Sequence, residues 1–180
     1  LALDIFREFM DKTRDDISKS PRDADINKGV PPPALQLDYN KSKKIINLHH
    51  PNEIKVNELK LLEVINNRKS YRNYSEQLLT LEELSWLLWA TQGVTDIVEK
   101  PVGVSNPTRA TLRTVPSSGA CHPFETYIII NKVEGLRNGL YRYLAIEHKL
   151  LEIKIEEDLT TKIAEICWRQ YFIKSSAIIF

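Results

Sequence analysis

Hydrophobic residues near the N-terminus recur at helical spacing, with charged residues between them. The first segment therefore predicts an amphipathic helix that ends at about Asp16 and packs against the body of the protein or a second subunit. Over residues 17–56 the periodicity fails, and prolines and a glycine interrupt a polar stretch. We expect this stretch to be an extended arm, in part of polyproline II type.

A short helix is predicted after the arm. Asn57 is a suitable N-terminal cap, and the helix delivers the chain to Arg68. Its apolar side is formed by Leu59, Leu62, Val64 and Ile65.

A second, Leu-rich helix has clearer boundaries. Thr80 and Glu83 have the spacing of a capping box, and Gly93 is a typical residue for the end of a helix. Leu84, Leu87 and Leu88 are expected to share its buried face. Residues 94–112 contain prolines and a glycine without periodicity, which predicts a long loop.

The remainder of the chain alternates between strand and helix patterns. Apolar or alternating runs predict strands at residues 127–131, 140–143 and 150–155, with a last strand at 176–180. A helix is expected to begin at Asp158 or Thr160 and to turn Ile163, Ala164 and Ile166 inward. Helices before the strands and a helix after them predict an α+β sandwich.

Residues 113–127 combine turn-forming residues with hydroxyl groups just before an apolar strand. Pro116 fixes its own backbone, and Gly119 tolerates conformations that other residues avoid. Ser117 and Ser118 add two hydroxyls that donate and accept hydrogen bonds. A ligand can approach such a backbone closely and still find polar partners, although an ordinary turn before a strand has the same composition.

A second candidate site is the segment Arg68-Lys-Ser-Tyr-Arg72, which gathers three cations and a hydroxyl within a short stretch. Paired guanidinium groups suit a phosphate monoester. The alternative interpretation is a solvated basic turn.

Composition limits the other function classes. The chain has 180 residues, of which 42% are hydrophobic and 27% charged, as in a globular protein with a sizeable core. A formal net charge of +1 gives no reason to expect a nucleic-acid partner. No apolar run is long enough to span a membrane and no secretory pattern is present, so a cytoplasmic location is expected.

The two cysteines give no disulfide framework and no metal-ligand spacing, and no metal is expected. Cys121 and His122 are adjacent, but neighbours in sequence usually diverge, which argues against a thiol nucleophile. No glycine-rich dinucleotide or nucleoside-triphosphate loop occurs.

The order of these segments resembles the nitroreductase superfamily of flavoproteins, and in particular its azoline-dehydrogenase-like branch of the SagB/ThcOx type. The resemblance covers residues 59–180. It rests on Arg68-x-Ser-x-Arg72, Leu84-Ser-Trp-Leu-Leu-Trp-Ala-Thr-Gln-Gly93, Arg113-Thr-Val-Pro-Ser-Ser-Gly119, His122-Pro-Phe-Glu-Thr-Tyr127 and Gly139-Leu-Tyr-Arg-Tyr143 with His148 and Leu150.

This resemblance implies an α-β-α sandwich with a central, mostly antiparallel sheet, an intertwined homodimer, and FMN bound non-covalently between the subunits. Arg68, Ser70 and Arg72 would hold the phosphate and ribityl chain, with Lys69 adding charge or backbone contacts. The other subunit would border the isoalloxazine ring with Pro116, Ser117, Ser118 and Gly119. Simple nitroreductases commonly have amide residues where this chain has Ala120 and His122, so contacts to the ring edge are expected to differ.

The domain prediction is an N-terminal helix and arm over residues 1–56 and an FMN-binding domain over residues 57–180. The chain begins at Leu1 and stops within an apolar run, so we expect a fragment that lacks the C-terminal part of the domain. That part would contain the catalytic residues of the azoline dehydrogenases, and no catalytic residue can be named here.

The expected function is that of an FMN-dependent oxidoreductase which passes a hydride through flavin N5 in a ping-pong cycle. Its electron donor would be NAD(P)H, and its acceptors would be nitro or quinone-type compounds. One alternative is a SagB-like dehydrogenase that oxidises thiazoline or oxazoline rings in peptides. Another is a non-catalytic dimeric interaction protein. The substrate is accordingly a small molecule or a peptide.

Overall fold

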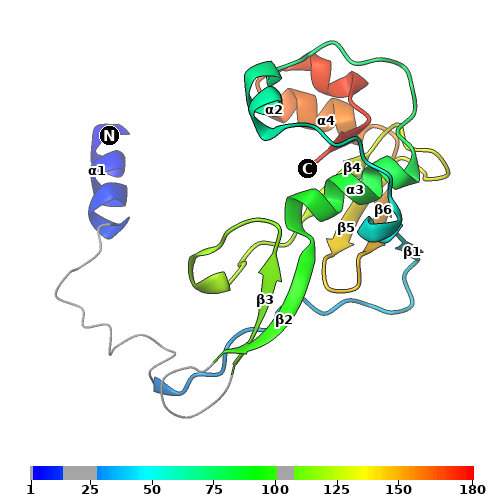
Figure 1. The fold of residues 1–180 in the computed structure, drawn as a ribbon. Coiled ribbons are helices and arrows are strands. Elements are labelled where there is room, and N and C mark those ends of the chain that lie inside the picture. Colours follow the sequence, from blue (N-terminus) through cyan, green and yellow to red (C-terminus); the bar gives the residue numbers. More distant parts are fainter. Residues whose placement is uncertain (1, 14–27, 101–107) are drawn as a thin grey trace. The chain divides into compact units, whose positions relative to one another are not determined.

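The computed structural model describes residues 2–13, 28–100 and 108–180, and the chain divides into two compact units (Figure 1). The first contains Leu1–Pro33 and Glu99–Thr108, and the second contains Ala34–Val98 and Arg109–Phe180. The candidate site and the sheet both belong to the second unit. The sequence-based boundary between residues 56 and 57 stays a prediction.

The first unit contains the helix α1 (Ala2–Thr13), which confirms the amphipathic helix expected at the N-terminus. Ile5, Phe9 and Met10 lie on its surface and are exposed. The predicted last turn up to Asp16 falls outside the described residues.

The second unit is built on a five-stranded sheet with the strand order β1-β6-β5-β4-β7. Every neighbouring pair in it is antiparallel, and Ile128 lies opposite Tyr141 in the central pair. The register shifts between Leu140 and Tyr141, which marks a bulge. The strands are β1 (Ile45–Asn47), β4 (Tyr127–Ile130), β5 (Gly139–Leu144), β6 (Lys149–Ile155) and β7 (Ile178–Ile179).

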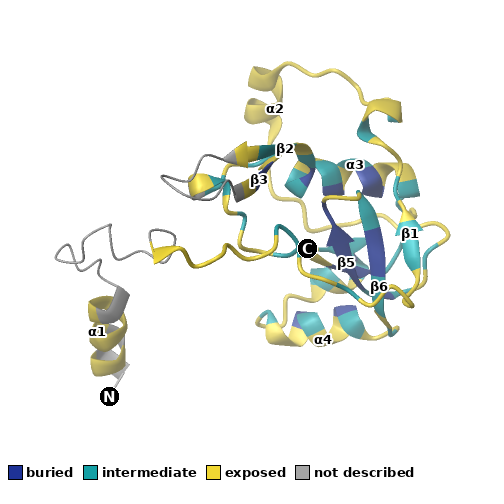
Figure 2. Ribbon diagram, turned by 90° about the horizontal axis from the view of Figure 1, so that it is seen from below, coloured by how far each residue is buried: buried dark blue, intermediate teal, exposed yellow. Residues whose placement is uncertain are grey.

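Two helices cover opposite faces of this sheet (Figure 2). α3 (Leu81–Gln92) begins with the predicted capping box between Thr80 and Glu83 and ends at Gly93, whose N–H donates to the carbonyl of Trp89. α4 (Leu159–Ile166) begins after Asp158 and lies on the other face. The predicted α-β-α sandwich with a mostly antiparallel sheet is therefore confirmed. No helix in the described ranges is both long and apolar enough to cross a bilayer.

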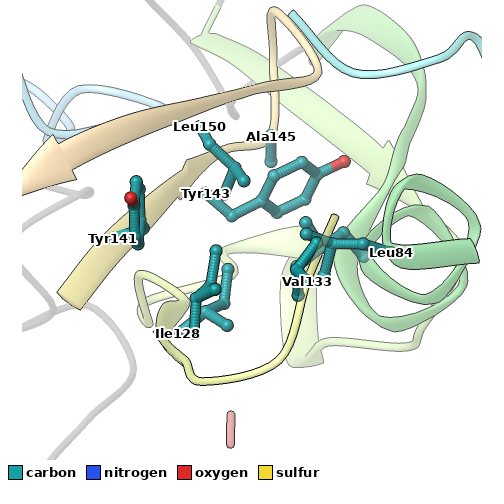
Figure 3. Packing of buried hydrophobic residues seen from close by; sticks show 9 residues of the cluster. Leu84, Ile128, Val133, Tyr141, Tyr143, Ala145 and Leu150 are labelled. Atoms are coloured by element: carbon teal, nitrogen blue, oxygen red, sulfur yellow. The ribbon is translucent and has the colours of Figure 1, made fainter. Parts of the chain in front are cut away.

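The main hydrophobic core lies between α3 and the sheet (Figure 3). Leu84 and Leu88 of α3 are fully buried and pack with Ile128, Tyr141 and Tyr143 of the central strands. Because side chains alternate along a strand, these residues share one face of the sheet.

Two inward-facing positions were predicted wrongly. Leu87 is 39% exposed, although Leu84 and Leu88 on the same helix are buried. Ile166 is 74% exposed at the last turn of α4, whereas Ala164 is fully buried. A helix in contact with a sheet buries only a narrow stripe, and the width of that stripe depends on the partner surface.

Two segments that were expected to be irregular contain strands. Within the predicted arm, β1 pairs with β6, and a short 3₁₀ helix η3 (Pro51–Glu53) follows it. Within the predicted loop, β2 (Val94–Lys100) and β3 (Thr108–Arg113) form a two-stranded sheet. The prediction failed because strands this short or this polar are defined by the partner with which they pair, which lies elsewhere in the sequence.

The short helix α2 (Leu61–Asn67) was predicted with the wrong start. Lys60 is its N-terminal cap and makes no side-chain capping bond, so the expected cap at Asn57 is incorrect. Its end is as predicted, because Arg68 is the C-terminal cap. Apolar side chains around it are exposed, namely Leu59, Leu61, Leu62, Val64 and Ile65.

Part of the arm is fastened to the end of the sheet by side chains that bind its backbone. Arg142 donates from one terminal nitrogen to the carbonyl of Leu37 at 2.7 Å and from the other to that of Asp38 at 3.5 Å. Glu125 accepts from the N–H of Leu37 at 2.6 Å. The Arg142 guanidinium also lies over the ring of Tyr39, with 5.7 Å from its carbon to the ring centroid.

We expect Arg142→Met to loosen residues 35–39, because this change removes both donors from the backbone carbonyls while keeping the apolar stem. Arg142 is only 5% exposed, so solvent cannot readily replace it. Hydrogen–deuterium exchange followed by mass spectrometry should show exchange in this segment accelerated at least about tenfold, as for a segment that opens locally. Arg137→Met is the matched control, since Arg137 is an exposed partner of Glu152. Equal exchange in both variants would contradict this role of Arg142.

Candidate functional site

The loop that follows β3 is fixed to the end of α3 by its first residue. The backbone N–H of Thr114 donates to the carbonyl of Gly93, and its hydroxyl donates to the carbonyl of Trp89, both at 3.0 Å. The Trp89 carbonyl accepts two bonds, since it also receives the N–H of Gly93 at the helix end. The position of residues 115–124 is thus set by the C-terminal turn of α3.

Three residues of this loop have left-handed backbone conformations. Gly119 has a φ of 61°, Ala120 of 52° and His122 of 42°. Only glycine adopts this region without a penalty, which is roughly 1–2 kcal/mol for other residues. Strain of this kind persists where surrounding bonds enforce it, and it concentrates at functional sites.

Ser117 supplies the bonds that enforce this backbone. Its carbonyl accepts from the N–H of Ala120 at 3.0 Å, which closes the 3₁₀ turn η4 (Ser118–Ala120). Its hydroxyl oxygen accepts from the N–H of His122 at 2.9 Å. The hydroxyl proton of Ser117 therefore stays available to a further acceptor.

A pocket of about 350 Å³ opens beside this loop, a size within the range of small-molecule sites. Two of the predicted ring-binding residues, Pro116 and Ser117, line it, whereas Ser118 and Gly119 are the first two residues of the turn η4. The walls combine apolar and polar groups. The lining residues are Gln92, Val115, Pro116, Ser117, Cys121, His122, Pro123 and Phe124.

Gln92 is a pocket residue that the sequence analysis did not single out. It is the last residue of α3, and its side-chain oxygen accepts from a terminal nitrogen of Arg113 at 3.4 Å. Its signals in the sequence are its place directly before the glycine that ends the helix and its inclusion in the segment 84–93 on which the family resemblance rests. That place turns a polar side chain toward whatever follows the helix, but the neighbour itself becomes visible only in three dimensions.

Arg113 connects the pocket to the arm. Its guanidinium donates to Gln92, to the hydroxyl of Thr111 at 3.2 Å and to the carbonyl of Leu35 at 3.5 Å. Burial lowers the pKa of Arg113 from its usual value, and the charge of Glu125 opposes this shift. All three acceptors are neutral, so the cation is held in place without an ion pair within the described part of the chain.

The basic segment lies directly after α2 and is exposed throughout. Lys69 lies over the ring of Tyr71, 5.1 Å from its centroid, and Arg72 lies over the ring of Phe172 at 5.7 Å. Phe172 belongs to the 3₁₀ helix η5 (Tyr171–Ser175). In the ranges that the structure covers, no carboxylate pairs with Arg68, Lys69 or Arg72. An anionic ligand would therefore not have to displace a described carboxylate from these three cations.

The basic segment and the pocket loop are separate within one chain. The lining of the pocket includes no residue of the segment 68–72. This separation agrees with the expectation that the two segments act on a ligand from different subunits, which stays a prediction.

Tyr143 and His148, which both belong to the motifs named in the sequence analysis, form a hydrogen-bonded pair. The Tyr143 hydroxyl lies 2.7 Å from Nδ1 of His148, and Nε2 of that ring lies 2.9 Å from the carbonyl of His49. Since the carbonyl only accepts, Nε2 carries the proton and Tyr143 donates to Nδ1. Burial raises the pKa of Tyr143 and lowers that of His148, so the neutral pair is favoured. It fastens the segment after β1 to the sheet and takes no part in the pocket.

Comparison with known proteins identifies the family to which this chain belongs. The sequence pattern of the nitroreductase family matches residues 65–180, which include both the basic segment and the pocket loop. The chain belongs to the nitroreductase family. Its membership of the azoline-dehydrogenase-like branch stays a prediction.

Two similar proteins carry the same family name. A protein of Methanocaldococcus jannaschii, named as a nitroreductase, is 34% identical over 124 residues, which are 69% of this chain and 56% of the relative. A crystal structure from Anabaena variabilis, also named as a nitroreductase, superposes with a TM-score of 0.61 at 18% identity. That match covers 97% of this chain and 30% of the other. The chain thus spans little more than half of its curated relative, and the structural likeness confirms the fold alone.

Proposed function

We propose that this protein is an FMN-dependent oxidoreductase that acts as a homodimer. The observation that carries the proposal is the strained loop after β3, which places Pro116 and Ser117 on the wall of a pocket in a nitroreductase-like fold. A flat ring needs an edge of backbone that it can approach closely, and this loop offers one. Bound FMN would supply the hydride-transfer chemistry, in which N5 takes a hydride from one substrate and gives it to a second.

The residues of the basic segment fit the phosphate of FMN. Arg68 and Arg72 are exposed and have no carboxylate partner among the described residues, so they can form charge-assisted bonds with a phosphate. Ser70 adds a hydroxyl for the ribityl chain, and Lys69 adds a further positive charge. Phe172 steadies the Arg72 guanidinium from one side.

The pocket loop fits the ring. Val115, Pro116, Pro123 and Phe124 provide apolar contact, while Ser117 provides a hydroxyl donor. Phe124 is 82% exposed, so this wall is open to a second surface. A second copy of the chain that brings its basic segment to this opening would complete the site, with Pro116–Gly119 of one subunit facing the clamp of the other.

The acceptor would be a nitro or quinone-type compound, with NAD(P)H as the donor. Both substrates would use the same open side of the pocket in turn, as the proposed ping-pong cycle implies. The protein's part is to hold the ring, to limit access of water and to place the substrate against it.

The test is the visible absorption of the purified protein before and after incubation with FMN. Bands near ~375 and ~450 nm, with FMN recovered from the supernatant after denaturation, would support the proposal, since the cofactor carries the chemistry. Anaerobic NADPH should then bleach the longer-wavelength band, and menadione should restore it. A colourless protein that takes up no FMN would refute the proposal and favour a non-catalytic interaction protein.

A further inference from the structure

The pocket beside the strained loop contains two hydrogen-bond donors that the described chain leaves unused. The Ser117 oxygen already accepts from His122, so the hydroxyl proton is available. The Gln92 oxygen accepts from Arg113, which turns the amide nitrogen away from that guanidinium. In the part of the chain that the structure covers, neither the hydroxyl proton nor the amide nitrogen has a bonding partner.

The orientation of the Gln92 amide follows from chemistry. A guanidinium only donates hydrogen bonds, so the group that faces Arg113 must be the side-chain oxygen. Arg113 is in turn held by Thr111 and by the carbonyl of Leu35. The two N–H bonds of Gln92 are therefore committed to the opposite side, while the residue itself lines the pocket.

The other walls define what these donors can meet. Val115, Pro116, Pro123 and Phe124 are apolar and suit the body of a conjugated ring. A ligand that satisfies the whole pocket is therefore flat, with an apolar body and hydrogen-bond acceptors such as carbonyl or nitro oxygens at its edge. An edge that carries only donors would leave the Ser117 hydroxyl and the Gln92 amide without acceptors.

We propose that Gln92 is a ligand-binding residue of this pocket, that it donates to an acceptor oxygen on a conjugated ring, and that Arg113 is its positioning residue. This assignment rests on the proposed function and adds a residue outside the predicted ring-binding loop. The acceptor oxygen belongs either to the edge of the flavin ring or to a quinone or nitro substrate. Both present the same chemistry to the amide.

The test uses Gln92→Glu, which keeps the size of the side chain and an oxygen for Arg113 but replaces the donors by a carboxylate. Gln77→Glu is the matched control, because it makes the same charge change at an exposed position away from this pocket. Three quantities are measured in each variant: the Kd for FMN, the Kd for riboflavin, and KM for menadione with the FMN-loaded protein. The thermal unfolding midpoint checks that both variants are folded.

If Gln92 binds the flavin edge, Gln92→Glu should raise the Kd for FMN and for riboflavin by about tenfold, because an acceptor replaces a donor opposite a carbonyl. If Gln92 binds the acceptor substrate, both Kd values should stay unchanged and KM for menadione should rise by a similar factor. Either result supports the assignment and identifies the source of the oxygen.

The role of Arg113 is tested by Arg113→Met alone and combined with Gln92→Glu. If Arg113 acts through Gln92, the effects of the two changes on the affected constant should be strongly non-additive. Wild-type uptake of FMN with both Kd values and KM unchanged in Gln92→Glu would overturn the Gln92 assignment while leaving the proposed function standing. Absence of FMN uptake by the wild type would overturn both.

Discussion

Replacing Arg68 and Arg72 together by alanine is expected to raise the Kd for FMN at least about 100-fold. Each guanidinium would lose charge-assisted hydrogen bonds to the phosphate worth about 1.5–3 kcal/mol, and 1.4 kcal/mol corresponds to a factor of ten. Quenching of flavin fluorescence in a titration measures the change. Riboflavin, which lacks the phosphate, should lose little affinity in the same variant.

Two comparisons separate the phosphate clamp from a general effect of charge or folding. Lys41→Ala with Lys55→Ala removes the same number of positive charges from exposed positions and should leave the Kd for FMN nearly unchanged. The thermal unfolding midpoint of the arginine variant should also stay close to that of the wild type, because both side chains are exposed. An unchanged Kd for FMN in the arginine variant would show that these residues do not bind the phosphate.

Leu84→Ala is expected to lower the free energy of unfolding by about 2–5 kcal/mol, since it removes a fully buried side chain and leaves a cavity. Leu84 belongs to the hydrophobic core and lies beside Val133 on the side of α3 (Figure 3). Urea denaturation followed by circular dichroism measures the loss as a lower transition midpoint. A loss of this size is a large part of the stability of an ordinary domain.

Leu87→Ala is the control on the same helix. Leu87 is 39% exposed, so the same chemical change should cost less than about 1 kcal/mol, which is typical of partly exposed positions. If Leu84→Ala and Leu87→Ala lower the midpoint equally, the burial of Leu84 between α3 and the sheet would be contradicted.

Prediction from sequence succeeded where a signal and its structural effect lie within a few residues. Thr80, Glu83 and Gly93 set the two ends of α3, because capping groups act on backbone atoms of the adjacent turn. The runs that became β4, β5 and β6 were recognisable because their hydrophobic residues match the face of a buried sheet. The turn-forming residues of the pocket loop likewise indicated an unusual backbone, and Gly119 has one.

Prediction failed where a residue's state depends on a partner distant in sequence. β1 exists through its pairing with β6, and Arg142 binds carbonyls about a hundred positions before it. Asn57 has the chemistry of a cap, but the chain becomes helical only after Lys60. Local propensity is a weak prior, and tertiary contacts readily override it.

The sequence by itself determined the family pattern, the ends of α3 and the composition of the two candidate segments, because these depend on residue types at short spacing. Only the tertiary structure decided that Gln92 joins Pro116 and Ser117 in one pocket and that Arg113 orients its amide. The physical reason is that a hydrogen bond or a pocket wall requires atoms within a few ångströms. The Arg113–Gln92 contact meets that requirement only once the end of α3 and the end of β3 are brought together.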